Sequence, residues 1–192
     1  LGTEILGLVT GGRKIKVTMA DLVPDWIVPE LTPLCPFEQF VPWCQTRPPV
    51  WIRVQTVDVD EVKQELRDAE VPFDTHPLMP NSLKLGRAKV NLRALPAFRN
   101  GKFEIQDVAS QAVSQLCAPE PGERWWDACA GAGGKTLHLA ELMEQTGTVV
   151  ATDKRKSILE ELRKRARRAG FPNIRYRYWK GKELAKHSGK FD

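Results

Sequence analysis

The pattern of apolar and polar residues in the second half of the chain alternates between two periods. Short apolar runs rich in β-branched and aromatic residues predict three strands, at residues 124–130, 148–153 and 174–179. Helical spacing of apolar positions predicts helices at residues 108–116, 136–144 and 157–169. Ser157 has the form of an N-cap, and Gly170 the form of a helix end. The alternation of strands and helices from 124 to 179 predicts the start of a parallel, doubly wound α/β sheet.

The pattern before residue 100 is different. A strand is predicted at 50–56, followed by a helix at 59–70 that places Val62 and Leu66 on one face. Further strands are predicted at 83–85 and 90–92. We therefore expect a proline-rich, partly helical leader over residues 1–46 and a small α/β module over 47–100. The remaining domain is expected to span residues 101–192.

Length and composition limit the class of protein. The chain has 192 residues, of which 42% are hydrophobic, which is enough to build a core. The longest stretch without a charge, Val108 to Pro119, is too short to cross a bilayer. The chain opens without a basic-then-apolar leader, so a cytoplasmic location is expected. Because it begins at Leu1 and stops at Asp192, we expect it to be part of a longer protein.

Charge is distributed unevenly. Residues 1–100 hold 12 basic and 12 acidic residues, whereas 101–192 hold 17 and 12. The segment 154–190 alone has 14 basic residues against three acidic ones. Such a segment attracts a polyanion, and RNA or DNA is the commonest one in cytoplasm. The alternative is a solvated basic helix with no ligand.

The four cysteines, Cys35, Cys44, Cys117 and Cys129, form no C-x-x-C pair and no zinc-type cluster with the histidines. Reduced thiols are expected, and no metal site is predicted.

The segment after the first predicted strand carries the most chemical information. Asp127 ends the strand, and residues 128–134, here called the glycine turn, read Cys-Ala-Gly-Ala-Gly-Gly from Cys129 onward. A P-loop requires glycine where Cys129 stands, and the dinucleotide fingerprint requires a third small residue where Thr136 stands. What remains is an acid at a strand end, followed by glycines that let the backbone approach a ligand at a helix start.

A second acid, Asp153, ends the next predicted strand. In doubly wound sheets an acid there accepts hydrogen bonds from ribose hydroxyls. Together the two strand ends indicate a nucleoside-containing cofactor such as S-adenosylmethionine. The alternative is that Asp127 caps the turn and Asp153 is an ordinary helix N-cap.

Two segments carry a family resemblance, Phe103–Gln111 and Asp127–Thr136, and Pro48–Thr56 extends it. They resemble the Sun family of RNA cytosine-5 methyltransferases, which includes nucleolar proteins, and the likeness covers residues 47–192. The resemblance implies a class I (Rossmann-like) methyltransferase sheet, incomplete at its C-terminal side, preceded by a small RNA-contacting module. It also implies an S-adenosylmethionine pocket lined by Cys129, Ala130, Gly131, Ala132, Gly133, Gly134, Lys135 and Asp153.

This sequence departs from the family pattern at two places. The usual Ala-Pro-Gly-Gly is Gly-Ala-Gly-Gly at residues 131–134, which remains compatible with a methyltransferase turn. After the third strand, Lys180 stands where the family tends to place an acid near the adenine. A lysine cannot accept a hydrogen bond from the adenine amine.

The family activates cytosine with a cysteine thiolate that adds to C6, while a second cysteine assists product release. The motifs that carry both cysteines would follow residue 192, so no catalytic residue is expected in this chain. Cys129 belongs to the glycine turn, which places it under the cofactor rather than facing a base.

The sequence thus predicts an S-adenosylmethionine-dependent RNA (cytosine-5) methyltransferase, with rRNA favoured over tRNA. The candidate RNA contacts are Arg53, Arg163, Arg165 and Arg168. One alternative is a non-catalytic RNA-binding or scaffold protein that keeps the fold, which Lys180 favours. The other is a small-molecule methyltransferase, which the upstream module and the basic segment oppose.

Overall fold

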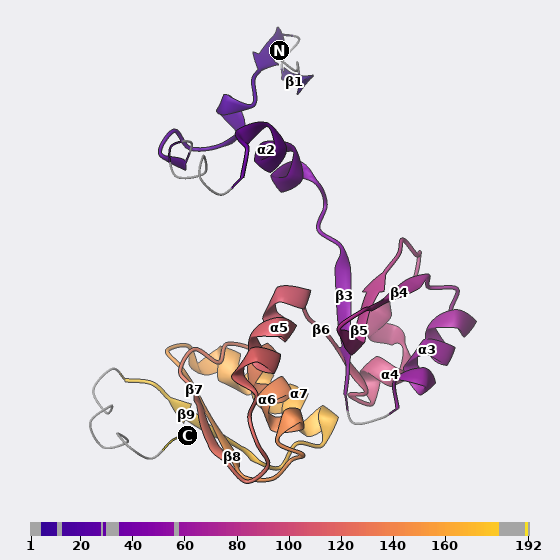
Figure 1. Ribbon diagram of the computed structural model, residues 1–192, viewed down its shortest axis with the longest axis vertical. Coiled ribbons are helices and arrows are strands. Elements are labelled where there is room, and N and C mark those ends of the chain that lie inside the picture. The colour runs from indigo at the N-terminus through magenta and orange to yellow at the C-terminus, as the bar shows by residue number, and fades with distance from the viewer. Residues whose placement is uncertain are drawn as a thin grey trace. The chain divides into compact units, whose positions relative to one another are not determined.

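The computed structural model describes residues 5–10, 13–27, 29, 35–55, 58–180 and 191. The chain forms two compact units, Leu1–Pro48 and Pro49–Asp192, and each is described by itself (Figure 1). Thr56 of the predicted first strand and residues 181–190 of the basic segment lie outside the described residues.

The first unit contains a strand pair and a helix. Its elements are β1 (Ile5–Thr10), β2 (Arg13–Val17), the 3₁₀ turn η1 (Ala20–Leu22) and α2 (Phe37–Gln45). β1 and β2 pair antiparallel, which the proline-rich composition did not lead us to expect. Pro36 stands at the N-cap of α2, where its missing N–H is not needed, and Pro42 lies inside the helix.

The second unit begins with an antiparallel sheet. Its elements are β3 (Val50–Val54), α3 (Val59–Asp68), β4 (Phe73–His76), β5 (Met79–Leu85), η2 (Leu92–Ala94), α4 (Pro96–Arg99) and β6 (Phe103–Ile105). The strands follow the order β4-β5-β3-β6, and this is the module sheet. Asp58 is the N-cap of α3, and its side chain accepts a hydrogen bond from the Asp60 N–H. Val62 and Leu66 are buried in the core of the module, as their spacing predicts.

The module sheet differs from the sequence prediction in three strands. Residues 90–92 form no strand, and the 3₁₀ turn η2 begins at Leu92. Two observed strands were not predicted: β4, which pairs antiparallel with β5, and β6, which pairs antiparallel with β3. Because β6 lies at residues 103–105, the module sheet extends beyond residue 100, where the sequence predicts the boundary.

The rest of the second unit is a parallel sheet whose strands alternate with helices along the chain. Its elements are α5 (Val108–Cys117), β7 (Arg124–Asp127), α6 (Gly134–Leu142), β8 (Thr148–Asp153), α7 (Lys156–Ala169) and β9 (Ile174–Tyr178). The strands pair parallel in the order β7-β8-β9, which confirms the predicted parallel sheet. α6 and α7 lie on the same face of this sheet (Figure 1). Leu137 of α6, Val149 of β8 and Leu162 of α7 are fully buried in its core.

Helix α7 ends as predicted but begins differently. Gly170 terminates it in a left-handed conformation, with φ +75°. The helix starts at Lys156 after an Arg155 N-cap that makes no side-chain capping bond, so the Ser157 capping box is wrong. The reason is that the turn before α7 is closed by Asp153, whose carboxylate accepts the Arg155 N–H.

Candidate functional site

The glycine turn joins the end of β7 to the start of α6. Gly131 and Gly133 have φ +53° and +90°, a backbone region that side chains disfavour. A Cβ on Gly133 would lie 2.5 Å from Leu162 Cγ, so this glycine lets the turn pack directly against α7. The turn is closed internally by a bond from the Gly133 N–H to the Ala130 carbonyl, 2.9 Å.

The Asp127 carboxylate accepts hydrogen bonds from a residue at the start of the glycine turn and from one just after it. Its Oδ2 accepts the Thr136 hydroxyl proton at 2.7 Å, and its Oδ1 accepts the Cys129 N–H at 3.3 Å. The carboxylate therefore has the turn-capping role that the sequence left open as an alternative.

Asp153 lies against the same turn from the end of β8. Its Oδ2 accepts the Gly131 N–H at 3.0 Å, which joins the two strand-end motifs through one hydrogen bond. The Arg155 guanidinium also reaches this carboxylate, with Nε 3.1 Å from Oδ1 and Nη2 3.2 Å from Oδ2. The hydrogen bond from the Arg155 side chain is the largest cause that lowers the pKa of Asp153 to about 2. Asp153 is thus a carboxylate held ionised beside the glycine turn.

The other residues predicted for the cofactor pocket lie in the turn or just after it. Ala130 is buried and donates its N–H to the Thr152 carbonyl at 3.0 Å, which ties the turn to β8. Cys129 is a free, exposed thiol, and Lys135 is exposed on the first turn of α6. Gly131, Ala132 and Gly134 are partly exposed and so are accessible to a ligand.

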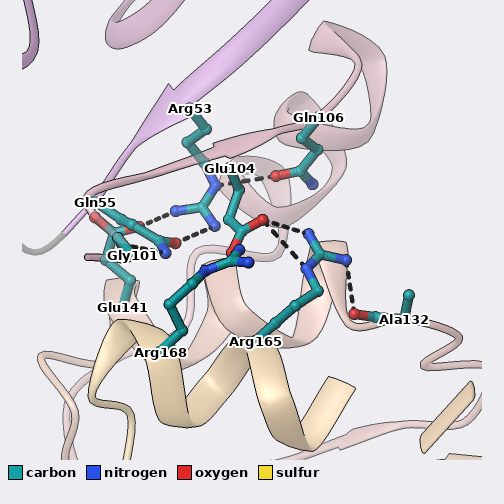
Figure 2. Close-up of polar contacts among 9 residues, drawn as sticks. All are labelled: Arg53, Gln55, Gly101, Glu104, Gln106, Ala132, Glu141, Arg165 and Arg168. Atoms are coloured by element: carbon teal, nitrogen blue, oxygen red, sulfur yellow. Dashed lines mark hydrogen bonds and ion pairs between the residues drawn. The ribbon is translucent and has the colours of Figure 1, made fainter. Parts of the chain in front are cut away.

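A buried polar network lies beside the turn (Figure 2). Arg53 of β3 is only 1% exposed. Its Nε donates to Gln106 Oε1 at 2.9 Å, its Nη2 donates to Gln55 Oε1 at 2.7 Å, and its Nη1 pairs with Glu141 of α6. Burial lowers the pKa of Arg53, and the charges of Glu141 and Glu104 oppose that shift. In this structure Arg53 therefore binds α6 inside the protein, rather than lying on a surface open to RNA.

Two of the three arginines predicted on α7 also turn inward. Arg165 and Arg168 both bind Glu104 of β6, a carboxylate that is 2% exposed (Figure 2). Their own side chains are 20% and 24% exposed. Only Arg163 is half-exposed, with an ion pair to Glu160 and its guanidinium 5.1 Å from the Tyr176 ring centre.

Sequence reasoning assigned no role to Glu104, Gln106 or Arg155. The signal for the network was present in β3 and the residue after it, where Arg53 and Gln55 alternate with apolar Ile52 and Val54. Alternation is typical of a strand with one solvent-exposed face. Here the polar side chains are buried as well, because α5 packs against β3 and Glu141 of α6 reaches Arg53.

Within the described ranges, no group of three His, Cys, Asp or Glu residues is placed to hold a metal ion. In the same ranges, no helix is long and apolar enough to span a membrane.

Comparison with known proteins gives consistent matches. The family model of the 16S rRNA methyltransferase RsmB/F matches residues 114–192. Ribosomal RNA small subunit methyltransferase B of Klebsiella pneumoniae is 35% identical over 136 residues, covering 69% of this chain and 31% of the relative. The crystal structure of PH0851 matches with a TM-score of 0.74 and 31% identity, covering 80% of this chain and 36% of that chain.

A methyltransferase homologue from Pyrococcus horikoshii has the same fold, with a TM-score of 0.65 at 24% identity, and covers 81% of this chain and 56% of that chain. The fold is therefore that of a class I methyltransferase, with an α/β sheet that is incomplete in this chain. The chain spans between 31% and 39% of the length of the first rRNA methyltransferase B relatives it matches. It belongs to the Sun family, which includes the RsmB/F methyltransferases.

Proposed function

We propose that this chain supplies the cofactor-binding half of an RNA methyltransferase that transfers a methyl group to cytosine C5, with rRNA as substrate. S-adenosylmethionine is the cofactor of the family. The observation that carries the proposal is the contact between Asp153 and the glycine turn, 3.0 Å from the carboxylate Oδ2 to the Gly131 nitrogen. The family match and the names of the relatives support RNA as the substrate.

The residues present fit such a cofactor. Two Arg155 nitrogens bind the Asp153 carboxylate, and the Arg155 side chain is 67% exposed. The Arg155 nitrogens therefore donate to the Asp153 carboxylate at the position where the ribose hydroxyls of a bound nucleoside would donate to it instead. A Cβ built on Gly131 would have the Arg155 Nη2 as its nearest neighbour at 3.9 Å, so the turn is open on the side that this flexible side chain covers. In the proposed complex Asp153 holds the ribose, and the glycine turn approaches the rest of the cofactor.

When bound, S-adenosylmethionine supplies an electrophilic methyl group. Cytosine C5 is too weak a nucleophile to accept it directly, and a thiolate that adds to C6 makes C5 enamine-like. Cys129 is exposed, but its backbone is part of the cofactor turn. We propose that the catalytic cysteines belong to the part of the protein outside this chain, and that Cys129 is not the nucleophile.

A methyl-transfer assay tests this assignment. With labelled S-adenosylmethionine and rRNA, we expect no label at cytosine from residues 1–192 and labelling from the longer protein. Label that appears with this chain and is lost only in Cys129→Ala would overturn the role given to Cys129. Labelling of another base by the longer protein would refute cytosine specificity.

RNA binding is proposed for the exposed face of α7. Arg163, Lys164 and Arg167 are exposed there, whereas Arg165 and Arg168 are engaged with Glu104. Exposed cations neutralise phosphates at little desolvation cost, and cations already paired in the interior do not. The small module remains the second proposed RNA contact, through surface residues other than Arg53.

One observation favours a second candidate, a non-catalytic RNA-binding protein with the same fold. Lys180 follows β9 and is exposed, and it offers no acceptor for the adenine amine. Calorimetry separates the candidates. The first requires saturable binding of S-adenosylmethionine or S-adenosylhomocysteine, and the second allows RNA binding with no cofactor binding.

A further inference from the structure

We propose that Arg165, held by Glu104, is a positioning residue that fixes the glycine turn in its cofactor-binding conformation. The inference rests on the proposed function, because it adds residues that act on the same cofactor site. Glu104 belongs to β6 of the module sheet, so a residue of the small module acts on the turn across the boundary between the two sheets.

The contacts of Arg165 define this role (Figure 2). Its Nη1 donates to the Ala132 carbonyl in the middle of the glycine turn at 2.7 Å. Its Nε and Nη2 donate to Glu104 Oε2 at 3.2 and 2.9 Å. One planar guanidinium thus binds a buried carboxylate on one side and the turn on the other. Lysine carries a single flexible ammonium and does not reproduce this fork.

The turn requires such an external bond because its own sequence constrains it weakly. Glycine loses more conformational freedom on ordering than any other residue, and three of the four residues 131–134 are glycine. Ala132 stands between the two left-handed glycines, Gly131 and Gly133. A hydrogen bond to its carbonyl therefore restricts the peptide planes that face the cofactor.

Helix α7 presents two residues to the turn, one turn of helix apart. Leu162 is fully buried and occupies the space where Gly133 has no side chain. Arg165 adds the hydrogen bond to Ala132 three residues later. Packing sets how close α7 lies to the turn, and the bond from Arg165 sets the orientation of the Ala132 carbonyl.

Glu104 in turn holds Arg165 rigidly. It lies opposite Arg53 in the β3–β6 register, so both side chains lie on the same face of the module sheet. Its Oε1 accepts from Arg168 Nη2 at 2.5 Å, while its Oε2 is taken by Arg165. Hydrogen bonds between charged groups are the strong ones, and a carboxylate with both oxygens engaged has little freedom to move.

Arg168 is a matched control within the same network. It binds the same carboxylate from the same helix and lies with its guanidinium 4.2 Å from the Phe98 ring centre. Within the part of the chain that the structure describes, Arg168 makes no hydrogen bond to the glycine turn. Removal of Arg168 thus tests the ion pair with Glu104 and the contact with Phe98, without a bond to the turn. Removal of Arg165 tests the ion pair together with the bond to the turn.

The experiment compares Arg165→Gln with Arg168→Gln in the chain of residues 1–192. Each is measured for urea stability, for the Kd of S-adenosylhomocysteine by calorimetry, and for amide hydrogen exchange of residues 131–134. Both variants should lose similar stability. Only Arg165→Gln should raise the Kd, by roughly 5- to 10-fold for one lost hydrogen bond. It should also speed exchange in the turn. Arg165→Lys should resemble Arg165→Gln in both readouts, since it keeps the charge but not the fork.

Equal changes of Kd and exchange in the Arg165 and Arg168 variants would overturn the proposal, because the role would then be general stability. An unchanged Kd and unchanged turn exchange in both Arg165 variants would overturn it as well. Failure of the unaltered chain to bind S-adenosylhomocysteine would refute the proposed function instead. Turn exchange in the absence of ligand would still decide whether Arg165 positions the turn. Should Arg165→Gln fail to fold, the same comparison is made with Arg165→Lys.

Discussion

Replacement of Arg53 by methionine should destabilise the second unit strongly and leave the salt dependence of RNA binding unchanged. The guanidinium is 1% exposed and donates three side-chain bonds, to Gln106, Gln55 and Glu141. Methionine keeps much of the side-chain volume but donates none of these bonds. All three acceptors lose this donor, and Glu141 loses the opposite charge.

The magnitude follows from these contacts. A bond to a charged partner contributes about 1.5–3 kcal/mol and a neutral one about 0.5–1.5 kcal/mol. One bond to Glu141 and two to glutamines therefore give about 2.5–6 kcal/mol, of which the relieved burial of Arg53 offsets a part. Loss of one partner of a buried ion pair costs a similar amount, about 3–5 kcal/mol. This is a large fraction of the stability of a typical domain, about 5–15 kcal/mol.

Urea unfolding followed by circular dichroism measures the effect, and Arg163→Met is the matched control. Arg163 is half-exposed and pairs only at the surface of α7, so its replacement should change stability by no more than about 0.5 kcal/mol. The double variant Arg53→Met with Glu141→Leu should recover part of the loss, because it removes both charges together. A loss below about 1 kcal/mol in Arg53→Met, combined with a flatter salt slope for RNA, would refute the internal role of Arg53.

Three further results are expected. Asp153→Ala should weaken S-adenosylhomocysteine binding by about 1–3 kcal/mol, because the ribose hydroxyls then lack an acceptor, and an unchanged Kd in this variant contradicts the pocket. Arg155→Gln should strengthen the binding, since no side chain then competes for the Asp153 carboxylate. Replacement of Arg163 and Arg167 by glutamine should flatten the log–log salt slope of RNA binding by about 1.4–1.8, and an unaltered slope would mean that this face of α7 points away from RNA. Burial lowers the pKa of His138 to about 3, so near pH 6.5 the unfolded chain takes up a proton that the folded chain does not. The free energy of unfolding should therefore fall as the pH drops from about 6.5 towards 3, by up to about 1.4 kcal/mol per pH unit. In urea titrations, His138→Gln should remove this slope.

The sequence by itself determined the elements whose signals are local. The periods of the apolar pattern located β8 at its observed bounds, and α5, β7, α6, α7 and β9 to within a few residues. Gly170 marked the end of α7 because a left-handed residue favours glycine. The glycine turn and Asp153 were recognisable because their signals are local too, since the turn follows β7 directly and Asp153 is the last residue of β8. Their bond through the Gly131 N–H is a consequence of parallel neighbouring strands, whose carboxyl ends meet at one edge of the sheet.

Only the tertiary structure decided which charges lie inside. Arg53, Arg165 and Arg163 are the same residue type, and each lies in a segment of mixed polarity. Arg53 is buried because Glu141, 88 residues later, reaches it from α6, and Arg165 turns inward because Glu104, 61 residues earlier, is there to bind it. The placement of β6 beside β3 is equally non-local, and it brings Glu104 next to Arg53. A charged side chain enters the interior only where an opposite charge compensates its desolvation, and that partner is fixed by the folded chain rather than by neighbouring residues.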